Sequence, residues 1–326
     1  MAEERRDDGT HADEAPRSGE RGKRGGEAKP ARERLDVLLV ERGLAPSRER
    51  ARALILAGEA RVEGQPAPKA GMLVHRDARL ELVGDGEVRY ASRGGLKLER
   101  ALDAFGLNPA GLVCLDIGAS TGGFTDVLLR RGAAKVYAID VGRGQLAWTL
   151  RSDPRVVVMD RTNIRHLAAL PELAGCAVID VWFISLRLAL PPVVALLAPG
   201  TWVVALVKPQ FEAGRAEADR GAGVISDPAV HQRVLRELLA WLETLSAPVE
   251  ADGPRLAAKG LIVSPITGRE GNHEYLLWLA LDQAHAGSGD EPRGVVGEAV
   301  IETAVSQAFG IHDETRPARP HAAASE

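Results

Sequence analysis

The sequence predicts an α/β protein whose main part is a Rossmann-like domain with a mostly parallel sheet, preceded by a smaller α+β domain. From residue 112 onward, apolar strand-like runs alternate with helical stretches, and this order produces βαβ units. The first of these runs leads into a glycine-rich turn and a helix, the usual place for a cofactor in a doubly wound sheet. We therefore expect a ligand crevice at the carboxyl ends of the strands.

Seven segments are expected to form the sheet of a large domain over residues 95–283, because each is rich in apolar or β-branched residues. They span residues 112–117, 134–139, 155–159, 176–181, 201–207, 255–263 and 273–280. Before the sixth strand, Asp227 and Pro228 are a cap and a first-turn proline that begin a helix. Residues 284–326 are expected to hold a linker, a helix over 296–309 that packs back onto the large domain, and a disordered end.

The glycine-rich turn runs from Asp116 to Gly123 and has the pattern D-x-G-x-x-x-G-G. A dinucleotide-binding fingerprint would show G-x-G-x-x-G. The wider spacing resembles the first motif of methyltransferases that use S-adenosylmethionine (SAM), and it favours them over dinucleotide enzymes or a purely structural turn. The candidate cofactor contacts here are Asp116, Gly118, Ser120, Gly122, Gly123 and Phe124.

Acidic residues at the ends of the next two strands are further candidates for cofactor binding. Asp140 follows the second strand, 22 positions after Gly118, where a carboxylate can accept hydrogen bonds from the hydroxyls of a ribose. Its structural alternative is a helix cap. Val141 follows directly, and Asp160, at the end of the third strand, is a candidate contact for the adenine end of SAM.

The composition restricts the class of protein. The chain has 41 basic and 45 acidic residues and a net charge of -4, so any nucleic-acid binding must use a local basic surface. No apolar run approaches the roughly 20 residues that span a bilayer, and the charged start lacks the apolar segment of a signal peptide. We therefore expect a cytoplasmic protein. Cys114 and Cys176 lie in apolar strands, which favours buried thiols over a disulfide or a metal site.

The N-terminal third is expected to hold three segments. Residues 1–31 mix seven basic with eight acidic residues and contain no Leu, Ile, Val or aromatic side chain, so they should form a disordered tail. Residues 32–84 should form the small domain, with one helix ending at Gly43, a second capped by Ser47, and short strands. Residues 85–94 are the expected linker.

The second helix of the small domain places Arg48 and Arg52 one turn apart. Such a charge run is often only a solvated helix face. The stretch R-L-D-x-x-L-V-x-R-G-L-x-x-S-R-x-x-A-x-x-L-I-x-x-G, however, resembles S4-type RNA-binding domains. That resemblance implies contacts with an RNA backbone, and the candidate residues are Arg34, Arg42, Arg48, Arg52, Lys69 and, in the linker, Arg93.

Four charged residues form a candidate catalytic group. Asp180 and Lys208 end the fourth and fifth strands, so both should point into the crevice beside Gly118. Lys97 opens the large domain, and Glu274 lies in G-N-H-E-Y near the last strand. A lysine at the rim of an apolar core can act as a general base. Surface solvation is the structural alternative for any one of the four.

Five motifs, in order, closely resemble the TlyA family, in which an S4 domain is fused to an FtsJ-like methyltransferase. They are S-R-G-G-x-K-L, D-I-G-A-S-T-G-G-F-T, D-V-x-F-I-S-L, V-K-P-Q-F-E-A-G and S-P-x-x-G-x-x-G-N-x-E-Y, within residues 32–281. The resemblance implies that the protein uses SAM to methylate the 2'-hydroxyl of a cytidine in ribosomal RNA, and that this reaction needs no metal. The implied partner is ribosomal RNA, either free or within ribosomal subunits. It also implies that the family's Lys-Asp-Lys-Glu tetrad falls on Lys97, Asp180, Lys208 and Glu274.

Three alternatives compete with this hypothesis. A non-catalytic RNA-binding or ribosome-assembly factor could bind SAM without transferring methyl, but the intact tetrad disfavours it. The membrane-active haemolysin implied by the family's older name would need a strongly amphipathic apolar segment. A base-directed amino methyltransferase would show Pro-Pro and an aromatic residue after Asn or Asp, where this chain has Asp180-Val181-Trp182-Phe183.

Two positions depart from the family pattern. Trp182 stands where relatives usually carry a small serine, and it could either pack between strand and helix or narrow the site for the target nucleoside. Residues 215–223 lack the family's G-K-G-G run, although their length and glycines still suit a mobile lid.

Overall fold

The computed structural model describes most of the chain as two parts, each with its own hydrophobic core. The described residues are 32–56, 59–67, 69, 71–82, 89–214, 217, 223–245, 255–268, 270–282 and 296–311. The predicted tail over 1–31 and the predicted disordered end after the C-terminal helix concern residues outside these ranges, and so does the first part, 85–88, of the predicted linker. Within them, no helix has the length and apolar character needed to cross a bilayer.

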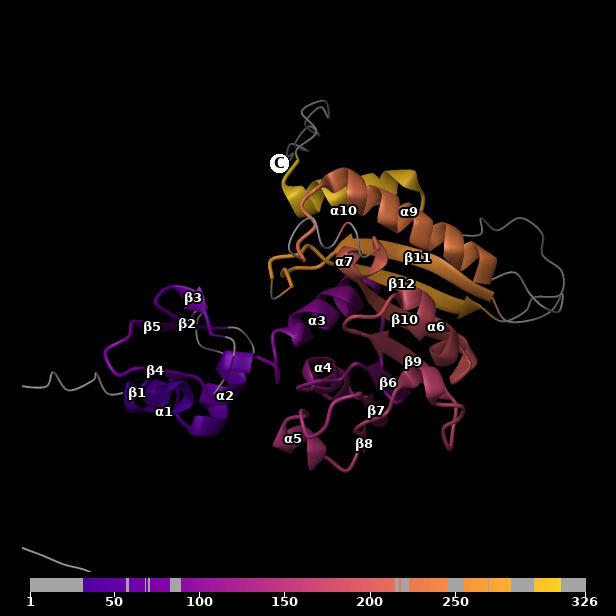
Figure 1. Ribbon diagram of the computed structural model, residues 1–326. Coiled ribbons are helices and arrows are strands. Elements are labelled where there is room, and N and C mark those ends of the chain that lie inside the picture. The colour runs from indigo at the N-terminus through magenta and orange to yellow at the C-terminus, as the bar shows by residue number, and fades with distance from the viewer. Residues whose placement is uncertain are drawn as a thin grey trace, which may run out of the picture.

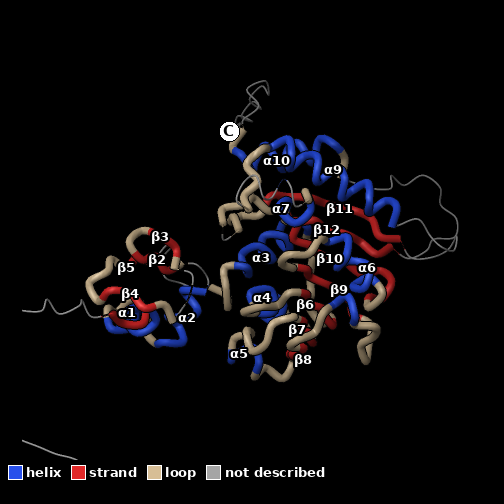
Figure 2. The backbone as a smooth tube through the Cα atoms, in the orientation of Figure 1, coloured by secondary structure: helices blue, strands red, loops and turns tan. Residues whose placement is uncertain are grey.

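The large domain is built on a seven-stranded sheet with the order β11-β12-β10-β9-β6-β7-β8. Figures 1 and 2 show these strands from β11 at one edge of the sheet to β8 at the other. The strands are β6 (Val113–Ile117), β7 (Lys135–Ile139), β8 (Val156–Met159), β9 (Ala174–Ile179), β10 (Leu197–Val207), β11 (Arg255–Val263) and β12 (Tyr275–Asp282). Strand β12 runs opposite to the other six strands of this sheet. The predicted fold class, a mostly parallel seven-stranded sheet, is confirmed.

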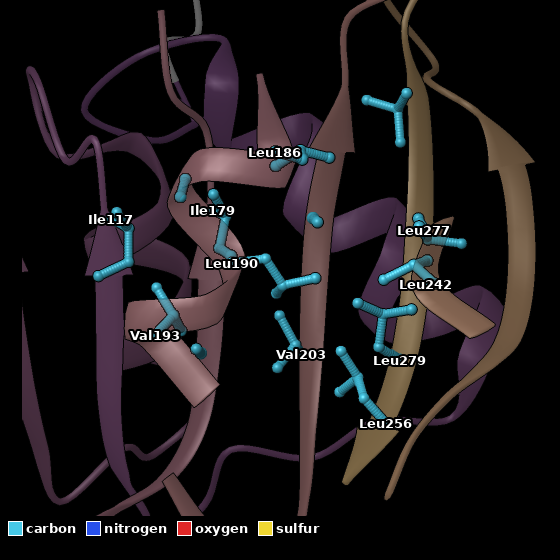
Figure 3. Packing of buried hydrophobic residues seen from close by; sticks show 14 of the residues in the cluster. Ile117, Ile179, Leu186, Leu190, Val193, Val203, Leu242, Leu256, Leu277 and Leu279 are labelled. Atoms are coloured by element: carbon cyan, nitrogen blue, oxygen red, sulfur yellow. The ribbon is translucent and has the colours of Figure 1, made fainter. Parts of the chain in front are cut away.

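Helices cover both faces of this sheet because successive strand residues point to opposite sides. The helices are α3 (Gly94–Phe105), α4 (Gly123–Arg130), α5 (Trp148–Arg151), η1 (Ile164–His166), α6 (Leu186–Val194), α7 (Pro209–Glu212), α9 (Pro228–Leu245) and α10 (Glu298–Phe309). Ile117 and Ile179 pack in the layer of α6, α9 and α10, as Figure 3 shows for α6. Cys114 and Cys176, both free thiols, face the layer of α3 and α4.

The predicted C-terminal helix is confirmed as α10. Ile301, Ala304 and Val305 are buried in the same core cluster as α9 and β11. The side chain of Arg236 on α9 forms an ion pair with Glu298 at the start of α10. The chain therefore returns to the large domain after residues 283–295, which lie outside the described ranges.

Strand register brings the site residues together. In the parallel pair β6 and β9, Ile117 lies opposite Ile179, so the next residues, Gly118 and Asp180, are neighbours. In the antiparallel pair β10 and β12, Val207 lies opposite Tyr275. The residue after one and the residue before the other, Lys208 and Glu274, therefore meet at the same edge of the sheet.

Only the strand predicted over 255–263 has the predicted bounds; three others begin one residue later than predicted, and the remaining three differ more. The fourth strand ends at Ile179, so Asp180 lies in the following loop and not on the strand. The fifth begins at Leu197 rather than 201, because a register shift between Leu197 and Trp202 lets the strand continue through Pro199 and Gly200. The last strand begins at Tyr275 and leaves Glu274 before it.

The small domain contains two helices and two small sheets. Its elements are β1 (Arg32–Arg34), α1 (Leu35–Glu41), α2 (Arg48–Leu56), β2 (Ala60–Val62), β3 (Gln65–Pro66), β4 (Leu73–His75) and β5 (Leu80–Leu82). The hydroxyl of Ser47 accepts a hydrogen bond from the backbone N–H of Arg50 at 3.1 Å, so its predicted role as cap of the second helix is confirmed. Strand β1, which pairs with β4, was not predicted.

A buried histidine on α9 connects this helix to the first residue of β12. Nε2 of His231 lies 2.9 Å from the backbone oxygen of Ile225, and Nδ1 lies 2.8 Å from the hydroxyl of Tyr275. Because a carbonyl only accepts, Nε2 must carry the proton, and Nδ1 then accepts from Tyr275. Burial lowers the pKa of His231, so the native state favours the neutral ring.

We expect this histidine to make the fold sensitive to acid. Its folded pKa lies below the unfolded value of about 6.5, so its stabilising contribution is present above that pH and is lost as the pH falls through the folded pKa. Urea unfolding at pH 7.5 and 5.5 should show a larger loss of stability for the wild type than for His231→Leu. Equal losses in the two proteins would contradict this prediction.

Candidate active site

Two ion pairs lie side by side at the carboxyl edge of the sheet. Nζ of Lys208, after β10, lies 2.5 Å from Oδ1 of Asp180, after β9. Nζ of Lys97, on the first turn of α3, pairs with Oε2 of Glu274. The structure therefore brings together all four residues of the predicted tetrad, and it pairs each lysine with one carboxylate.

Lys208 is held on several sides at once. Its side chain is 3% exposed, and Nζ donates a hydrogen bond of 2.9 Å to the backbone oxygen of Val181. The same nitrogen lies 4.4 Å from the centre of the Trp182 ring and 5.8 Å from that of Phe211. Carboxylate, carbonyl and aromatic faces all favour a cation, so the position of this amine is fixed before any substrate binds.

Trp182 faces the site and does not pack between strand and helix. It is 43% exposed, and it lines both cavities described below. The first of its two predicted roles is therefore wrong. The second role, narrowing the site for the target nucleoside, stays a prediction.

Glu274 balances the charge of Lys97 in a buried position. It is 2% exposed, and burial raises the pKa of its carboxyl, although Lys97 and Lys208 act in the opposite direction. An isolated buried carboxylate would be costly. The nearby lysines therefore keep the ionised form accessible, and each half of the tetrad is close to electrically neutral.

We refer to the loop after β9, which carries Asp180, as the catalytic loop. The glycine-rich turn lies against this loop. Gly118 has φ +84, and a Cβ atom placed on it would overlap the backbone oxygen of Asp180. Only glycine permits both this backbone conformation and this close approach. Next to it, Asp116 is fully buried and accepts a hydrogen bond of 2.6 Å from the hydroxyl of Thr125, and burial raises its pKa to about 7.

Two adjoining cavities open at this edge and share Gly118, Ser120 and Asp180 in their walls. The larger, of about 770 Å³, continues over Asp140, Val141 and Gln145. The smaller, of about 90 Å³, is bounded by Arg93, Lys97 and Trp182. A large cavity for one ligand thus meets a small cavity beside the ion pairs.

The larger cavity fits a cofactor of the size of SAM. Its volume lies within the roughly 300–1,000 Å³ typical of small-molecule sites. Oδ1 of Asp116, in the wall of the smaller cavity next to the shared glycine turn, is buried without a hydrogen-bond partner among the described residues. A buried acceptor of this kind suits a ligand that brings a donor.

Asp140 lines the larger cavity while it organises the backbone around it. Its Oδ2 accepts from the N–H of Ser120 at 2.8 Å, and its Oδ1 accepts from the N–H of Gly142 at 2.6 Å. Each carboxylate oxygen retains a second lone pair for a ligand hydroxyl. Val141, next to it, is 70% exposed in the same wall.

Asp160 is placed differently from its predicted role. Its Oδ2 accepts from Nη2 of Arg151 at 2.9 Å and from the N–H of Gly144 at 3.1 Å, and it does not border either cavity. It braces the loop that forms the cavity wall, and a direct contact with adenine stays an untested prediction.

The remaining turn residues have mixed roles. Gly123 and Phe124 border the smaller cavity. Gly122 borders neither, and a Cβ there would overlap the side chains of Leu146 and Leu150. Its glycine is therefore explained by the packing of α5 and not by a ligand.

Arg93 lies in the wall of the smaller cavity, one turn before Lys97, and its Nε is buried without a hydrogen-bond partner among the described residues. Arg42 donates hydrogen bonds to the backbone oxygens of Arg76 and Ala78, which gives it a structural role in the small domain. Lys69 is exposed. Contacts of these three residues with RNA stay predictions.

Glu212 was missed as a structural support of the site, although it belongs to the motif V-K-P-Q-F-E. Its carboxylate accepts from the hydroxyl of Ser185 at 2.6 Å and from the N–H of Leu186 at 2.7 Å. This links α7, which follows Lys208, to the start of α6, whose cap Ser185 lies four residues after Val181. Glu212 thus closes a ring whose other link is the ion pair of Lys208 with Asp180.

We expect Glu212→Gln to lower both stability and turnover. An amide has one acceptor oxygen in place of two, so one buried donor at Ser185 or Leu186 loses its partner, at a cost of about 1–3 kcal/mol. Ser185→Ala should also lower stability, because its hydroxyl donates to Glu212 and accepts from the N–H of Arg187 as the cap of α6. Thermal unfolding and single-turnover rates measure the effects, and a Glu212→Gln protein equal to the wild type in both would contradict this role.

Asn272 was also missed, and it fixes the end of the loop predicted to be a lid. Its Nδ2 donates to the backbone oxygen of Gly223 at 2.8 Å, and its Oδ1 accepts from the N–H of Ile225 at 3.0 Å. Except for Glu217 and Gly223, the loop over 215–223 lies outside the described ranges. The cap predicted at Asp227 is confirmed by its bond of 2.9 Å from the N–H of Ala229.

A Rossmann-like sheet whose glycine turn meets a Lys-Asp-Lys-Glu group at the strand ends defines a methyltransferase domain. Comparison with family models agrees: residues 90–281 match the FtsJ-like methyltransferase family, and residues 33–80 match the S4 domain. The chain therefore belongs to the FtsJ-like methyltransferase family and carries an N-terminal S4 domain.

Characterised relatives place it in the TlyA group of that family. TlyA of Mycobacterium tuberculosis (strain H37Rv), named as a 16S/23S rRNA (cytidine-2'-O)-methyltransferase, is 45% identical over 275 residues, which cover 83% of this chain and 98% of the relative. Hemolysin A of Brachyspira hyodysenteriae is 37% identical over 74% of this chain and 98% of its own. A solved structure from Streptococcus thermophilus, described as a candidate hemolysin, shares 40% identity over 86% of this chain and 97% of its own, with a TM-score of 0.64.

Proposed function

We propose that this protein transfers a methyl group from SAM to the ribose 2'-hydroxyl of a cytidine in ribosomal RNA. The observation that carries this proposal is the pair of lysine–carboxylate ion pairs beside a small cavity that adjoins a larger, cofactor-sized one. The relatives named for this reaction supply the substrate class. RNA as substrate is also consistent with the S4 domain.

SAM, when bound, supplies a methyl group on a positively charged sulfur. Gly118, Ser120 and Asp140 border the larger cavity and would hold it. Methyl transfer is an in-line displacement, so a large part of the rate can come from holding donor and acceptor in line. Because Gly118 and Asp180 border both cavities, the two substrates would lie next to each other in this proposal.

The residues of the tetrad have separate roles in this proposal. Lys208, fixed by Asp180 and the Val181 carbonyl, orients the ribose hydroxyl. Once its ammonium group has released one proton to solvent, the neutral amine accepts the proton of the hydroxyl. Lys97 borders the smaller cavity and stabilises the oxygen as negative charge develops on it. Glu274 compensates the charge of Lys97, so that two lysines can share one buried site.

The rival hypothesis is a factor that binds RNA and SAM without catalysis. Incubation of the purified protein with methyl-labelled SAM and 30S subunits, 50S subunits, or free 16S and 23S rRNA distinguishes the two. We expect label in RNA, and resistance of one 2'-position to alkaline cleavage should identify a cytidine. Binding of rRNA without any transfer would overturn the enzymatic proposal and favour the rival.

A further inference from the structure

Three arginines of the S4 domain converge on one buried carboxylate. Asp36, in the first turn of α1, is 0% exposed. Arg34 donates to both of its oxygens, at 2.9 and 3.0 Å. Arg48 and Arg52 each donate to Oδ2, at 3.2 and 3.0 Å. We refer to these four residues as the Asp36 cluster.

The sequence brings the Asp36 cluster together from three elements. Arg34 ends β1, two residues before Asp36. Arg48 and Arg52 lie one turn apart on α2, which packs against α1. The side chains of the three arginines are 40%, 54% and 53% exposed. The carboxylate is thus at the base of the cluster, and the guanidinium groups face solvent.

The cluster remains strongly positive in spite of its aspartate. Three guanidinium charges and one carboxylate leave a formal charge of +2. Hydrogen bonds, of which those from Arg34 are the largest contribution, lower the pKa of Asp36, so it stays ionised over the physiological range. The bonds to Asp36 use four of the fifteen N–H donors that three guanidinium groups carry.

The arrangement matches a phosphate site more closely than a solvated helix face. Three like charges would separate in solution, whereas the shared carboxylate holds them within reach of one anion. Planar guanidinium groups suit phosphate because they offer paired donors. A fixed cluster also avoids part of the cost of ordering long side chains when a ligand binds.

We propose that Asp36 organises Arg34, Arg48 and Arg52 into one binding site for the phosphate backbone of RNA. Asp36 is a positioning residue here, because it touches the arginines and not the RNA. This inference rests on the proposed function, which supplies RNA as the partner. It leads to a counterintuitive expectation: removing a negative charge from this surface weakens binding to a polyanion.

The matched comparison is Asp36→Asn against Glu49→Gln in the full-length protein. Both remove one negative charge from the same helix pair, but Glu49 is exposed beside Arg48 on α2 and lies outside the cluster. The probe is end-labelled 16S and 23S rRNA, with affinity measured by filter binding from 50 to 300 mM KCl.

We expect Asp36→Asn to bind at least about fivefold more weakly at 100 mM KCl. The slope of log affinity against log salt should become shallower by about 0.7–0.9 for each RNA phosphate that the variant no longer neutralises. Glu49→Gln should bind slightly more tightly than the wild type. If the arginines act as independent charges, both variants gain affinity, and that outcome overturns the proposal.

A second pair of variants decides the question if Asp36→Asn fails to fold, as judged by circular dichroism. Arg52→Lys keeps the charge but cannot both bond to Asp36 and offer a planar fork. Arg79→Lys makes the same change at a residue that is 75% exposed and pairs with Glu81. The proposal requires Arg52→Lys to bind more weakly and Arg79→Lys to match the wild type. Equal affinities overturn it, whereas absence of any wild-type binding to rRNA contradicts the proposed function itself.

Discussion

Replacing Lys208 with alanine is expected to abolish methyl transfer, with a fall of at least about 10²–10⁴-fold in the single-turnover rate. In the proposed function its amine is the group that accepts the proton of the ribose hydroxyl, and alanine has no group that can do so. Lys208 does not border the larger cavity, so SAM binding, measured by calorimetry, should remain. Retained transfer would show that another group accepts the proton.

One further variant of Lys208 separates its possible roles, and a variant of Lys259 is the control. Lys208→Arg keeps the positive charge and can still pair with Asp180, but a guanidinium does not give up its proton in proteins. It should therefore be nearly as inactive as the alanine variant if proton acceptance matters. Lys259→Ala removes another lysine paired with a carboxylate, Asp282, at the far end of β12 from Glu274, and it should leave the rate unchanged.

Much of the site could be predicted because the position at which a buried strand ends can be recognised from a short stretch of sequence. A run of apolar residues followed by Asp180 or Lys208 indicates where a buried strand stops. In a parallel sheet all such ends lie on one edge, so residues 28 positions apart could be placed together without a structure. Asp180, Lys208 and the glycine turn were predicted on this basis, whereas the complete tetrad followed from the resemblance to the TlyA family.

The pairing within the tetrad could not be predicted in the same way. Lys97 lies on a helix ahead of the sheet, and Glu274 precedes an antiparallel strand. Their contact depends on how α3 packs against β12, which no periodicity in the sequence encodes. The two ion pairs follow from tertiary packing, and they explain why neither lysine is left uncompensated.

The supporting residues were missed for a related reason. Asp36, Glu212 and Asn272 all lie inside motifs that the sequence analysis used, but their partners come from other segments. A carboxylate in a motif can contact a ligand or hold a neighbouring element, and residue type alone does not separate these cases. The bonding partners do: the carboxylate of Asp36 is bonded to arginine side chains, and the amide of Asn272 is bonded to two backbone groups, which favours a supporting role over direct contact.

Aromatic side chains lie beside the buried amine of Lys208 in this site. Trp182, Phe183 and Phe211 have ring centres 5.4–6.3 Å apart. Glu212, next to Phe211, is bonded to Ser185, two residues after Phe183. Aromatic faces both hold a cation and stack on bases. The same wall could therefore position Lys208 and exclude water from the hydroxyl that it orients.

Substitution of Gly118 is expected to have the second large effect, and it acts on both substrates. A side chain at Gly118 overlaps the backbone oxygen of Asp180. Gly118→Val should therefore displace the turn from the catalytic loop, raise the dissociation constant for SAM by at least about tenfold, equivalent to 1.4 kcal/mol, and reduce transfer. Calorimetry with SAM and single-turnover transfer are the measurements.

A matched control separates the overlap from backbone strain. Gly111 has φ +74, close to the φ +84 of Gly118, but a Cβ there has no neighbour within 4 Å. Gly118→Ala and Gly111→Ala therefore share a backbone cost of roughly 1–2 kcal/mol, and only the first disturbs Asp180. Weakened SAM binding confined to Gly118→Ala would assign the effect to the contact between turn and catalytic loop. Equal SAM affinities in the two alanine variants would mean that this contact does not shape the cofactor site.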